Sequence, residues 1–266
     1  MRKEWRLILD EGGDAFFNMA KDEVLFTTYL KRKQPTLRIY SWSVPAISLG
    51  YFQKVEETLN LLAMVKRRIF FVRRITGGAA ILHNEDITYS LSLSTEDLNL
   101  SRSVKSSYKV LCSFLLNFYR GLGLNPCFPS DNDRKYGNFC FSTIHSYDII
   151  IGNKKIGGNA QKRRRNFIFH QGSIPIKINF DLVRELIKGV GYLEDKTLGL
   201  KDLVRDIHDW AEWRERLAFS FQETFGVRFF IDKLSKEEEE QVSYFKEHKY
   251  CSYEWNFKFK KTILAE

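Results

Sequence analysis

The chain of 266 residues is 44% hydrophobic and 15% aromatic, which supplies a sizeable core and excludes a wholly disordered protein. Its 42 Lys and Arg residues against 33 Asp and Glu residues give a formal net charge of +9, which suits an acidic partner: nucleic acid, an anionic membrane surface or an acidic protein. Cys112, Cys127, Cys140 and Cys251 show neither a disulfide framework nor zinc-ligand spacing. No signal-peptide pattern and no apolar run of about 18 residues is found, so we expect a cytoplasmic protein.

The first half of the chain predicts helices and strands in alternation. Asp14 precedes apolar residues at helical spacing, so we expect it to be the N-cap of a helix. Runs rich in β-branched and aromatic residues predict strands, and an apolar period of about 3.6 residues predicts a helix. The expected strands span residues 6–9, 37–42, 46–49, 69–73 and 87–94, and a second expected helix spans residues 55–68.

The second half begins with a long helical pattern over residues 101–124, followed by a polar, turn-rich loop at residues 129–135. Gly152-Asn153 is a good two-residue turn, so the residues around it predict a hairpin. The remaining elements are a strand over residues 167–178, a helical region over about residues 180–266, and a strand-like alternation at residues 253–259. Together they predict one α+β domain over residues 1–266, with a mixed β-sheet flanked by helices.

One segment with chemical potential is Arg73-Arg74, which is followed closely by Thr76-Gly77-Gly78. Glycines let a backbone approach a ligand, and their N–H groups can hold anionic or carbonyl oxygens. An ordinary turn between two strands explains the same residues, and spacing alone does not choose. The segment is neither a Rossmann fingerprint nor a P-loop.

A second segment places Lys155 at a strand end just before Gly157-Gly158. A lysine held against a glycine turn can balance an anion or polarise a carbonyl. The basic run Lys162–Arg165 that follows is typical of a solvated face, and nucleic-acid binding is the competing interpretation. No helix-turn-helix, zinc finger or RNA-binding motif accompanies it, so we do not expect nucleic acid as a partner.

A third candidate is Cys140, which follows the polar loop. A lone cysteine is usually a buried small hydrophobe, but a nearby ammonium would lower the pKa of its thiol and make it a nucleophile. His83, His145 and His170 lack metal-ligand spacing, and each is expected to be structural.

Taken together, these segments resemble the lipoate-protein ligase and octanoyltransferase family, whose fold is shared with the biotin protein ligase catalytic domain. The family has an Arg-Arg-x-Ser/Thr-Gly-Gly-x-Ala-Val-x-His segment, a Lys-Ile/Val-x-Gly-x-Ala-Gln segment and a His-x-Gly-Ser/Thr stretch. They are similar here to residues 73–83, 155–161 and 170–173, and the family's Gly-x-x-Gln turn to residues 50–53. The resemblance covers roughly residues 5–178 and implies a catalytic domain of the class II aminoacyl-tRNA synthetase and biotin–lipoate ligase type.

One branch of this family uses a cysteine thioester and no ATP. In that branch a Cys-Phe stands seven residues before a Tyr-Glu/Asp pair, and the essential lysine lies eight residues after the tyrosine. Cys140-Phe141, Tyr147-Asp148 and Lys155 have this spacing. The resemblance therefore implies catalytic roles for Cys140 and Lys155, while Cys112 and Cys127 have no such match and are expected to be structural.

The resemblance also implies the rest of the site. Backbone N–H groups near Gly77, Gly78 and Gly158 are candidate oxyanion donors, and Arg74 and His83 are expected to shape a loop over the acyl chain. The expected substrate-binding residues are Arg74, Thr76, Gly77, Gly78, His83, Gly158, Asn159, Ala160 and Gln161, and no metal is expected.

The implied reaction belongs to lipoate biosynthesis and needs no cofactor. It moves an octanoyl or lipoyl group from an acidic acyl carrier protein to a lysine of a partner. That partner is the lipoyl domain of a 2-oxoacid dehydrogenase, the glycine cleavage H protein, or both. Under this interpretation the basic run Lys162–Arg165 would steer acidic carriers to the site, and no membrane is involved.

Three alternatives remain open at this point. An ATP-dependent lipoate-protein ligase would use ATP and Mg to make lipoyl-AMP, and Cys140 would be incidental. An amidotransferase would move octanoyl or lipoyl groups between two lipoyl domains through the same cysteine. A basic module that only binds nucleic acid or acidic proteins would need neither Cys140 nor Lys155.

Overall fold

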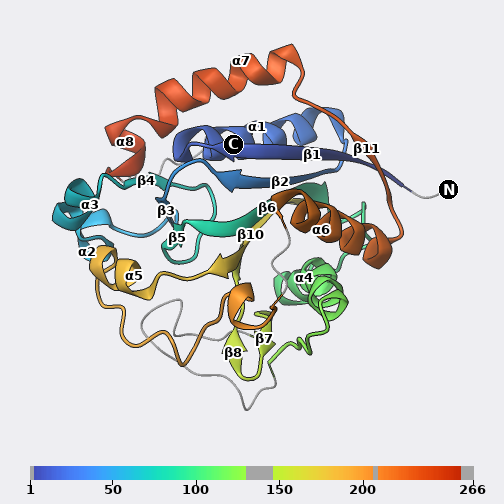
Figure 1. The fold of residues 1–266 in the computed structure, drawn as a ribbon. Helices are drawn as coiled ribbons and strands as arrows, with labels where there is room; N and C mark the ends of the chain where they lie inside the picture. The colour runs from blue at the N-terminus through green and yellow to red at the C-terminus, as the bar shows by residue number, and fades with distance from the viewer. Residues whose placement is uncertain (1–2, 130–145, 206–208, 259–266) are drawn as a thin grey trace.

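The computed structural model describes residues 3–129, 146–205 and 209–258 (Figure 1). Within these residues a six-stranded mixed sheet has the order β11-β1-β2-β6-β10-β9. Its strands are β1 (Glu4–Gly13), β2 (Thr36–Trp42), β6 (Glu85–Ser94), β9 (Gly158–Arg164), β10 (Phe167–Lys177) and β11 (Arg228–Ile231). β1 is parallel to both of its neighbours, β2 and β11, whereas β2, β6, β10 and β9 pair antiparallel in succession.

Two smaller sheets extend the fold. A three-stranded sheet has the order β4-β3-β5, with β3 (Ala46–Leu49), β4 (Phe70–Arg73) and β5 (Ile81–His83). A hairpin pairs β7 (Ile150–Ile151) with β8 (Lys154–Lys155). Its turn residues Gly152 and Asn153 have positive φ angles of 55° and 66°, as a type I′ turn requires, so the predicted hairpin is confirmed.

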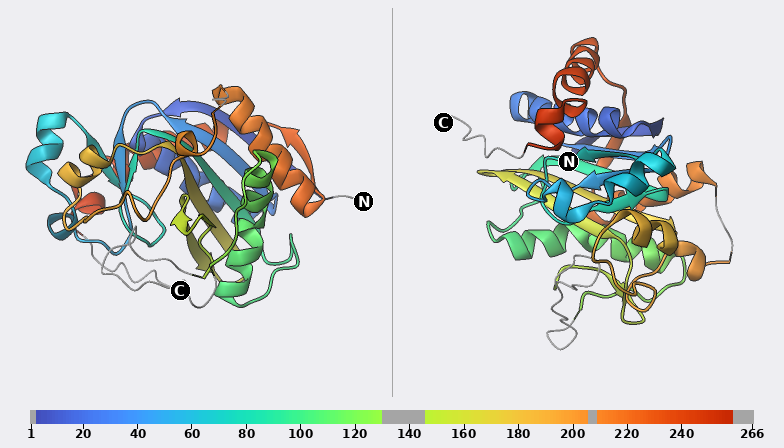
Figure 2. Two further views of the ribbon diagram at one scale, coloured as in Figure 1. Left: turned by 60° about the horizontal axis from the view of Figure 1, so that its bottom comes forward. Right: turned by 90° about the vertical axis from the view of Figure 1, so that its left-hand side faces the viewer.

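Helices cover both faces of the large sheet (Figures 1 and 2). α1 (Ala15–Arg32) and α7 (Lys236–Phe245) lie over one face, and α4 (Val104–Gly121) and α6 (Trp210–Phe225) lie over the other. Apolar side chains of β1, β2 and β6 pack against α4 and α6 in the largest core cluster, which includes the fully buried Ile39, Leu91, Phe114 and Phe221. The predicted α+β class, with a mixed sheet flanked by helices, is confirmed.

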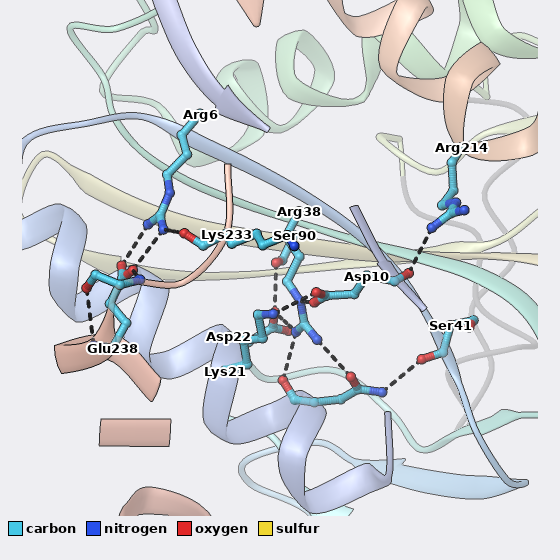
Figure 3. Close-up of polar contacts among 12 residues, drawn as sticks. Arg6, Asp10, Lys21, Asp22, Arg38, Ser41, Ser90, Arg214, Lys233 and Glu238 are labelled. Carbon is cyan, nitrogen blue, oxygen red and sulfur yellow. Dashed lines mark hydrogen bonds and ion pairs between the residues drawn. The ribbon is translucent and has the colours of Figure 1, made fainter. Parts of the chain in front are cut away.

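Buried ion pairs attach the helices of the first face to the sheet (Figure 3). The fully buried guanidinium of Arg38 on β2 donates to Asp10 at 2.6 Å, to Asp22 at 2.7 Å and to Asn18 Oδ1 at 2.8 Å. Asp22 and Asn18 belong to α1. Arg6 on β1 donates to Glu238 of α7 at 2.7 Å. Every one of these buried charges has a partner, which avoids the cost of an uncompensated ion.

Most predicted elements are present with shifted ends. Asp14 caps α1 by accepting from the Phe17 N–H at 2.9 Å, as expected. The predicted helix over residues 55–68 is wrong as one element: α2 (Val55–Thr58) and α3 (Leu61–Arg67) are separate. The break occurs because Leu59 is extended and forms a β-bridge with Ile187, after which Asn60 caps α3.

The last part of the chain differs most from expectation. The strand predicted at residues 253–259 is wrong where the structure describes it, because Tyr253–Asn256 form the short helix α8, capped by Ser252. The predicted helical region from about residue 180 holds α5 (Phe180–Leu186), α6, α7, the 3₁₀ turn η2 (Leu200–Asp202) and the π-helical η3 (Lys246–Tyr250), but also strand β11. Among the described residues no helix is long and apolar enough to cross a membrane.

Candidate active site

A cavity of about 260 Å³ gathers the predicted motifs. It lies between the Gly-Gly loop that joins β4 to β5, the paired strands β9 and β10, the β7–β8 hairpin and the start of α4. The predicted site residues that line it are Arg74, Gly77, Gly78, His83, Lys155, Gly158, Asn159, Ala160 and Gln161. Segments about 80 residues apart in the chain therefore meet at one place. Cys140 and His145 lie outside the described residues.

Lys155 is buried in this cavity, only 4% exposed, and its ammonium pairs with Asp148 at 2.9 Å. Its main chain is fixed as well: the N–H donates to Lys196 O at 2.8 Å, and the carbonyl accepts from Leu198 N at 3.0 Å and Thr197 Oγ1 at 2.9 Å. The main-chain hydrogen bonds and the ion pair of the ammonium together fix the position of this cation. A buried ammonium of this kind can hold an anion or polarise a carbonyl.

Arg74 shapes the Gly-Gly loop from within. Its guanidinium donates to the carbonyls of Gly77 and Ala79, both at 2.8 Å, and to Ser48 O at 2.8 Å. Since a trans peptide points its N–H opposite to its C=O, the N–H groups of Gly78 and Ala80 face away from this guanidinium. Thr76 accepts from Arg74 Nε at 3.2 Å and is fully buried behind the loop, so the structure does not place it on the cavity wall.

Backbone conformation requires a glycine at position 78 of the loop, and close packing against the loop requires one at position 50. Gly78 has a φ of +88°, and a Cβ built on Gly50 would lie 1.8 Å from the Gly78 carbonyl oxygen. Arg73 keeps the Gly50 turn in place by donating to the carbonyls of Tyr51 at 2.8 Å and Gln53 at 2.6 Å. The Gly-x-x-Gln turn and the Arg-Arg pair therefore build one unit that supports the cavity wall.

His83 is a structural part of the wall. Its imidazole stacks on Trp42 with centroids 3.9 Å apart, and its nitrogens lie 2.8 Å from Ser48 Oγ and 2.8 Å from Asp86 Oδ2. His170 is fully buried, and burial together with the nearby Arg163 guanidinium lowers its pKa to about 3. It is therefore neutral at physiological pH. His83, an expected substrate-binding residue, lines the cavity, whereas His170 does not.

Only the second half of the basic run Lys162–Arg165 is a solvated segment. Residues Lys162–Arg164 belong to β9, and only Arg164 and Arg165 are exposed. Arg163 donates to Gln161 Oε1 at 3.2 Å and to Arg102 O at 3.1 Å. Burial lowers the pKa of Lys162. Four consecutive basic residues do not show which side chains are half-buried and which are exposed. The sequence therefore could not distinguish Lys162 and Arg163 from Arg164 and Arg165.

Some contributors were missed by sequence analysis. Asp148 stood in the Tyr-Asp pair of the resemblance but was given no role, although it is the partner of Lys155. The segment Lys196–Leu198 carries no signal that could have revealed its hydrogen bonds to Lys155. Tyr108 and Trp42 also line the cavity, but in the sequence they only contribute to the apolar pattern of a helix and a strand.

None of the three cysteines that the structure describes is placed to react at this site. Cys112 is fully buried, and this burial raises the pKa of its thiol. Cys127 and Cys251 are exposed and neither lines the cavity. Across the described ranges, no group of three His, Cys, Asp or Glu side chains could hold a metal ion.

Comparison with known sequences identifies similar proteins over nearly the whole chain. Residues 14–222 match the family described as lipoyl protein ligase A/B catalytic domain. The chain is 31% identical to octanoyltransferase LipM of Bacillus subtilis, covering 97% of this chain and 100% of that protein. It is 32% identical to octanoyltransferase LipM of Kyrpidia tusciae, covering 96% of this chain and 98% of that protein.

Solved structures share the fold. A lipoate-protein ligase A bound with ATP has a TM-score of 0.82 at 28% identity, covering 96% of this chain and 98% of that chain. A T. acidophilum protein with bound lipoic acid has a TM-score of 0.81 at 26% identity, covering 96% of this chain and 99% of that chain. The lipoate-ligase-like fold expected from the sequence is therefore confirmed.

Proposed function

Since this chain belongs to the lipoyl protein ligase A/B catalytic domain family, we propose that it is an octanoyltransferase of lipoate biosynthesis that works through a thioester on Cys140. The octanoyl part of the proposal is supported by the relatives named for that activity, which align with this chain almost end to end. The observation in the structure that carries it is the buried Lys155 ammonium at a cavity lined by the predicted motifs.

The proposed reaction has two acyl transfers. The Cys140 thiolate adds to the carbonyl carbon of an octanoyl thioester on an acidic acyl carrier protein, and the carrier's sulfur leaves and takes up a proton. The ε-amine of a lysine on a lipoyl domain or on the glycine cleavage H protein then attacks the enzyme thioester. An amide forms, the amine loses a proton and the Cys140 thiol is restored. Because the thioester keeps the acyl group activated, the proposed reaction uses neither ATP nor a metal.

The described residues have separate roles in this proposal. Lys155 is the cation that would favour the thiolate and the developing negative charge, and Asp148 keeps it in place. The wall beneath the Gly-Gly loop, which includes Trp42 and Ile81, would take the acyl chain. Each methylene buried there would contribute about 0.8 kcal/mol.

An ATP-dependent lipoate-protein ligase is the second candidate, because a lipoate-protein ligase A bound with ATP shares this fold closely. In that reaction Lys155 would contact the acyl carbonyl and the α-phosphate of lipoyl-AMP, and Cys140 would have no role. An amidotransferase between lipoyl domains is the third, and it would use the same cysteine with a different donor.

Intact-protein mass spectrometry after incubation with octanoyl-acyl carrier protein, without ATP, tests the proposal. We expect wild type to gain an octanoyl mass that hydroxylamine removes, and Cys140→Ala to gain none. Cys112→Ala is the matched control and should acylate normally. An absence of adduct on folded wild type, with ATP-dependent lipoylation of a lipoyl domain in Cys140→Ala, would establish the ligase instead. Octanoyl-loaded lipoyl domain as the better donor would favour the amidotransferase.

A further inference from the structure

Two predicted motifs meet in the pairing of β9 with β10. The register places Asn159 opposite Gly172 and Gln161 opposite His170. Residues opposite each other in an antiparallel pair project from the same face of the sheet, here the face covered by α4. Tyr89 of the next strand, β6, pairs with Gly172 on its other side. The two motifs therefore supply one continuous row of polar side chains.

This row is a chain of hydrogen bonds with a fixed direction. Arg163 Nε lies 3.2 Å from Gln161 Oε1, and Gln161 Nε2 lies 3.2 Å from His170 Nδ1. His170 Nε2 lies 3.1 Å from the Tyr89 hydroxyl, which donates to Asn159 Oδ1 at 2.6 Å.

The direction follows from the first residue. Arginine only donates, so the Gln161 atom beside Arg163 must be its oxygen, and the Gln161 amide N–H must face His170. A neutral imidazole that accepts at Nδ1 carries its proton on Nε2 and donates to the Tyr89 oxygen. Tyr89 then gives its own hydrogen to Asn159, whose acceptor is Oδ1. The carboxamide N–H₂ of Asn159 is thereby left as a donor.

The chain keeps its protonation states. His170 is fully buried with a pKa lowered to about 3, and burial raises the pKa of Tyr89 well above its usual value. Neither group changes charge between pH 5 and pH 9, so the direction of the hydrogen bonds is constant over that range.

Gly172 supports the same geometry independently. A Cβ at this position would lie 2.1 Å from Asn159 Oδ1 and 2.6 Å from Tyr89 Cε1. Space for the contact between Tyr89 and Asn159 therefore exists only because residue 172 is glycine. The His-x-Gly motif supplies both the imidazole of the chain and this space.

We propose that the side-chain N–H₂ of Asn159 donates a hydrogen bond to the carbonyl oxygen of the acyl group, and that Tyr89, His170, Gln161 and Arg163 are positioning residues that aim it. Asn159 lines the cavity with Lys155, and its Nδ2 makes no hydrogen bond to any residue of the described ranges. The inference rests on the proposed acyl transfer. When the thiolate adds, the carbonyl π pair moves to oxygen, and Asn159 stabilises that oxyanion until the carrier's sulfur leaves and the pair returns.

The test is the single-turnover rate of Cys140 octanoylation by octanoyl-acyl carrier protein. Asn159→Asp keeps an acceptor for Tyr89 and removes the donor, so the maximal rate should fall on the order of 10²- to 10³-fold. Tyr89→Phe should lower the rate on the order of tenfold by freeing the Asn159 amide. In both variants the carrier concentration at half-maximal rate should change little. Gly172→Ala should resemble Tyr89→Phe.

Tyr29→Phe is the matched control, because Tyr29 is also buried, donates to Asp97 at 2.6 Å and does not line the cavity. It should lose stability in thermal denaturation but keep the wild-type acylation rate. A purely structural Tyr89 would behave in the same way. Rates of Asn159→Asp and Tyr89→Phe within twofold of Tyr29→Phe would overturn the inference.

A second readout is the pH profile of acylation from pH 6 to pH 9. We expect Tyr89→Phe to lower the rate by one constant factor, because the chain acts on the oxyanion and not on thiolate formation. A shifted profile would contradict the proposed role. If wild type forms no thioester at all, the proposed function fails first, and the two failures are thus distinguishable.

Discussion

Asp148→Asn should lower the free energy of unfolding by about 3–5 kcal/mol, because it leaves the Lys155 ammonium buried without a counter-charge. The Lys155 and Asp148 side chains are 6% and 4% exposed and 2.9 Å apart, so the pair is largely shielded from bulk solvent. Lys155→Met removes the ammonium that pairs with the buried Asp148 carboxylate and should also destabilise the fold. The double variant removes both charges and should recover most of the loss, since a buried ion pair is worth little against apolar groups of similar size.

Urea unfolding at pH 7 measures the free energy of unfolding of wild type, both single variants and the double variant. The double-mutant cycle formed by these four values gives the coupling energy between the two substitutions. We expect a coupling of several kcal/mol that changes little between low and high salt, because buried pairs are weakly screened. Acylation of Cys140 should be lost in both single variants and in the double variant, since stability can be restored without Lys155 but the chemistry cannot.

Single variants that each cost under about 1 kcal/mol and add without coupling would refute this reasoning, because such values are typical of a solvent-exposed pair. A double variant that still acylates at the wild-type rate would remove Lys155 from the proposed mechanism.

Three further predictions concern the loop, the buried histidine and the exposed basic residues. Gly78→Ala and Gly123→Ala, at φ +88° and +76°, should each cost about 1–2 kcal/mol in urea unfolding, but only Gly78→Ala should slow acylation; equal rates would separate the Gly-Gly loop from the site. In the unfolded chain His170 takes up a proton near pH 6.5, whereas in the folded protein its pKa is about 3. The free energy of unfolding should therefore fall by about 1.4 kcal/mol per pH unit as the pH drops below 6.5. His170→Gln should lose the contribution of His170 to the dependence of unfolding free energy on pH. Identical pH dependence in wild type and variant would contradict the assignment of this effect to His170. The groups that face this histidine are Tyr89, Tyr108, Cys112, Gln161 and Arg163. Glu at both Arg164 and Arg165 should slow association with an acidic carrier protein at low salt in stopped-flow measurements, whereas unchanged rates would reject steering.

The sequence alone determined the local elements and the identity of the motifs. Apolar periodicity predicted α1, α4 and the central strands, since each period is set by the backbone geometry of a single element. The Asp14 cap and the Gly152-Asn153 turn followed from side chains and φ preferences within a few residues. Resemblance of the spaced motifs indicated which residues would gather at one site.

Local signals failed wherever a distant segment competed. Leu59 interrupts a helical pattern because Ile187 pairs with it, and residues 253–256 form a helix although they alternate like a strand. In α8 the side chain of Asn256 accepts from the Arg73 N–H at 2.8 Å, and Trp255 donates to the Arg73 carbonyl at 2.7 Å. Contacts between residues almost 200 positions apart leave no periodic trace in the sequence.

Tertiary structure alone decided how the site residues act. Sequence analysis predicted that Arg74 binds substrate, but its guanidinium donates hydrogen bonds to carbonyls of the Gly-Gly loop. Arg163 stood in a charged run, yet it begins the hydrogen-bond chain that ends at Asn159. Hydrogen bonding and burial depend on which strands lie side by side and in which register. Register is fixed only when the whole sheet packs its apolar face, and so the roles of these residues are a property of the assembled fold.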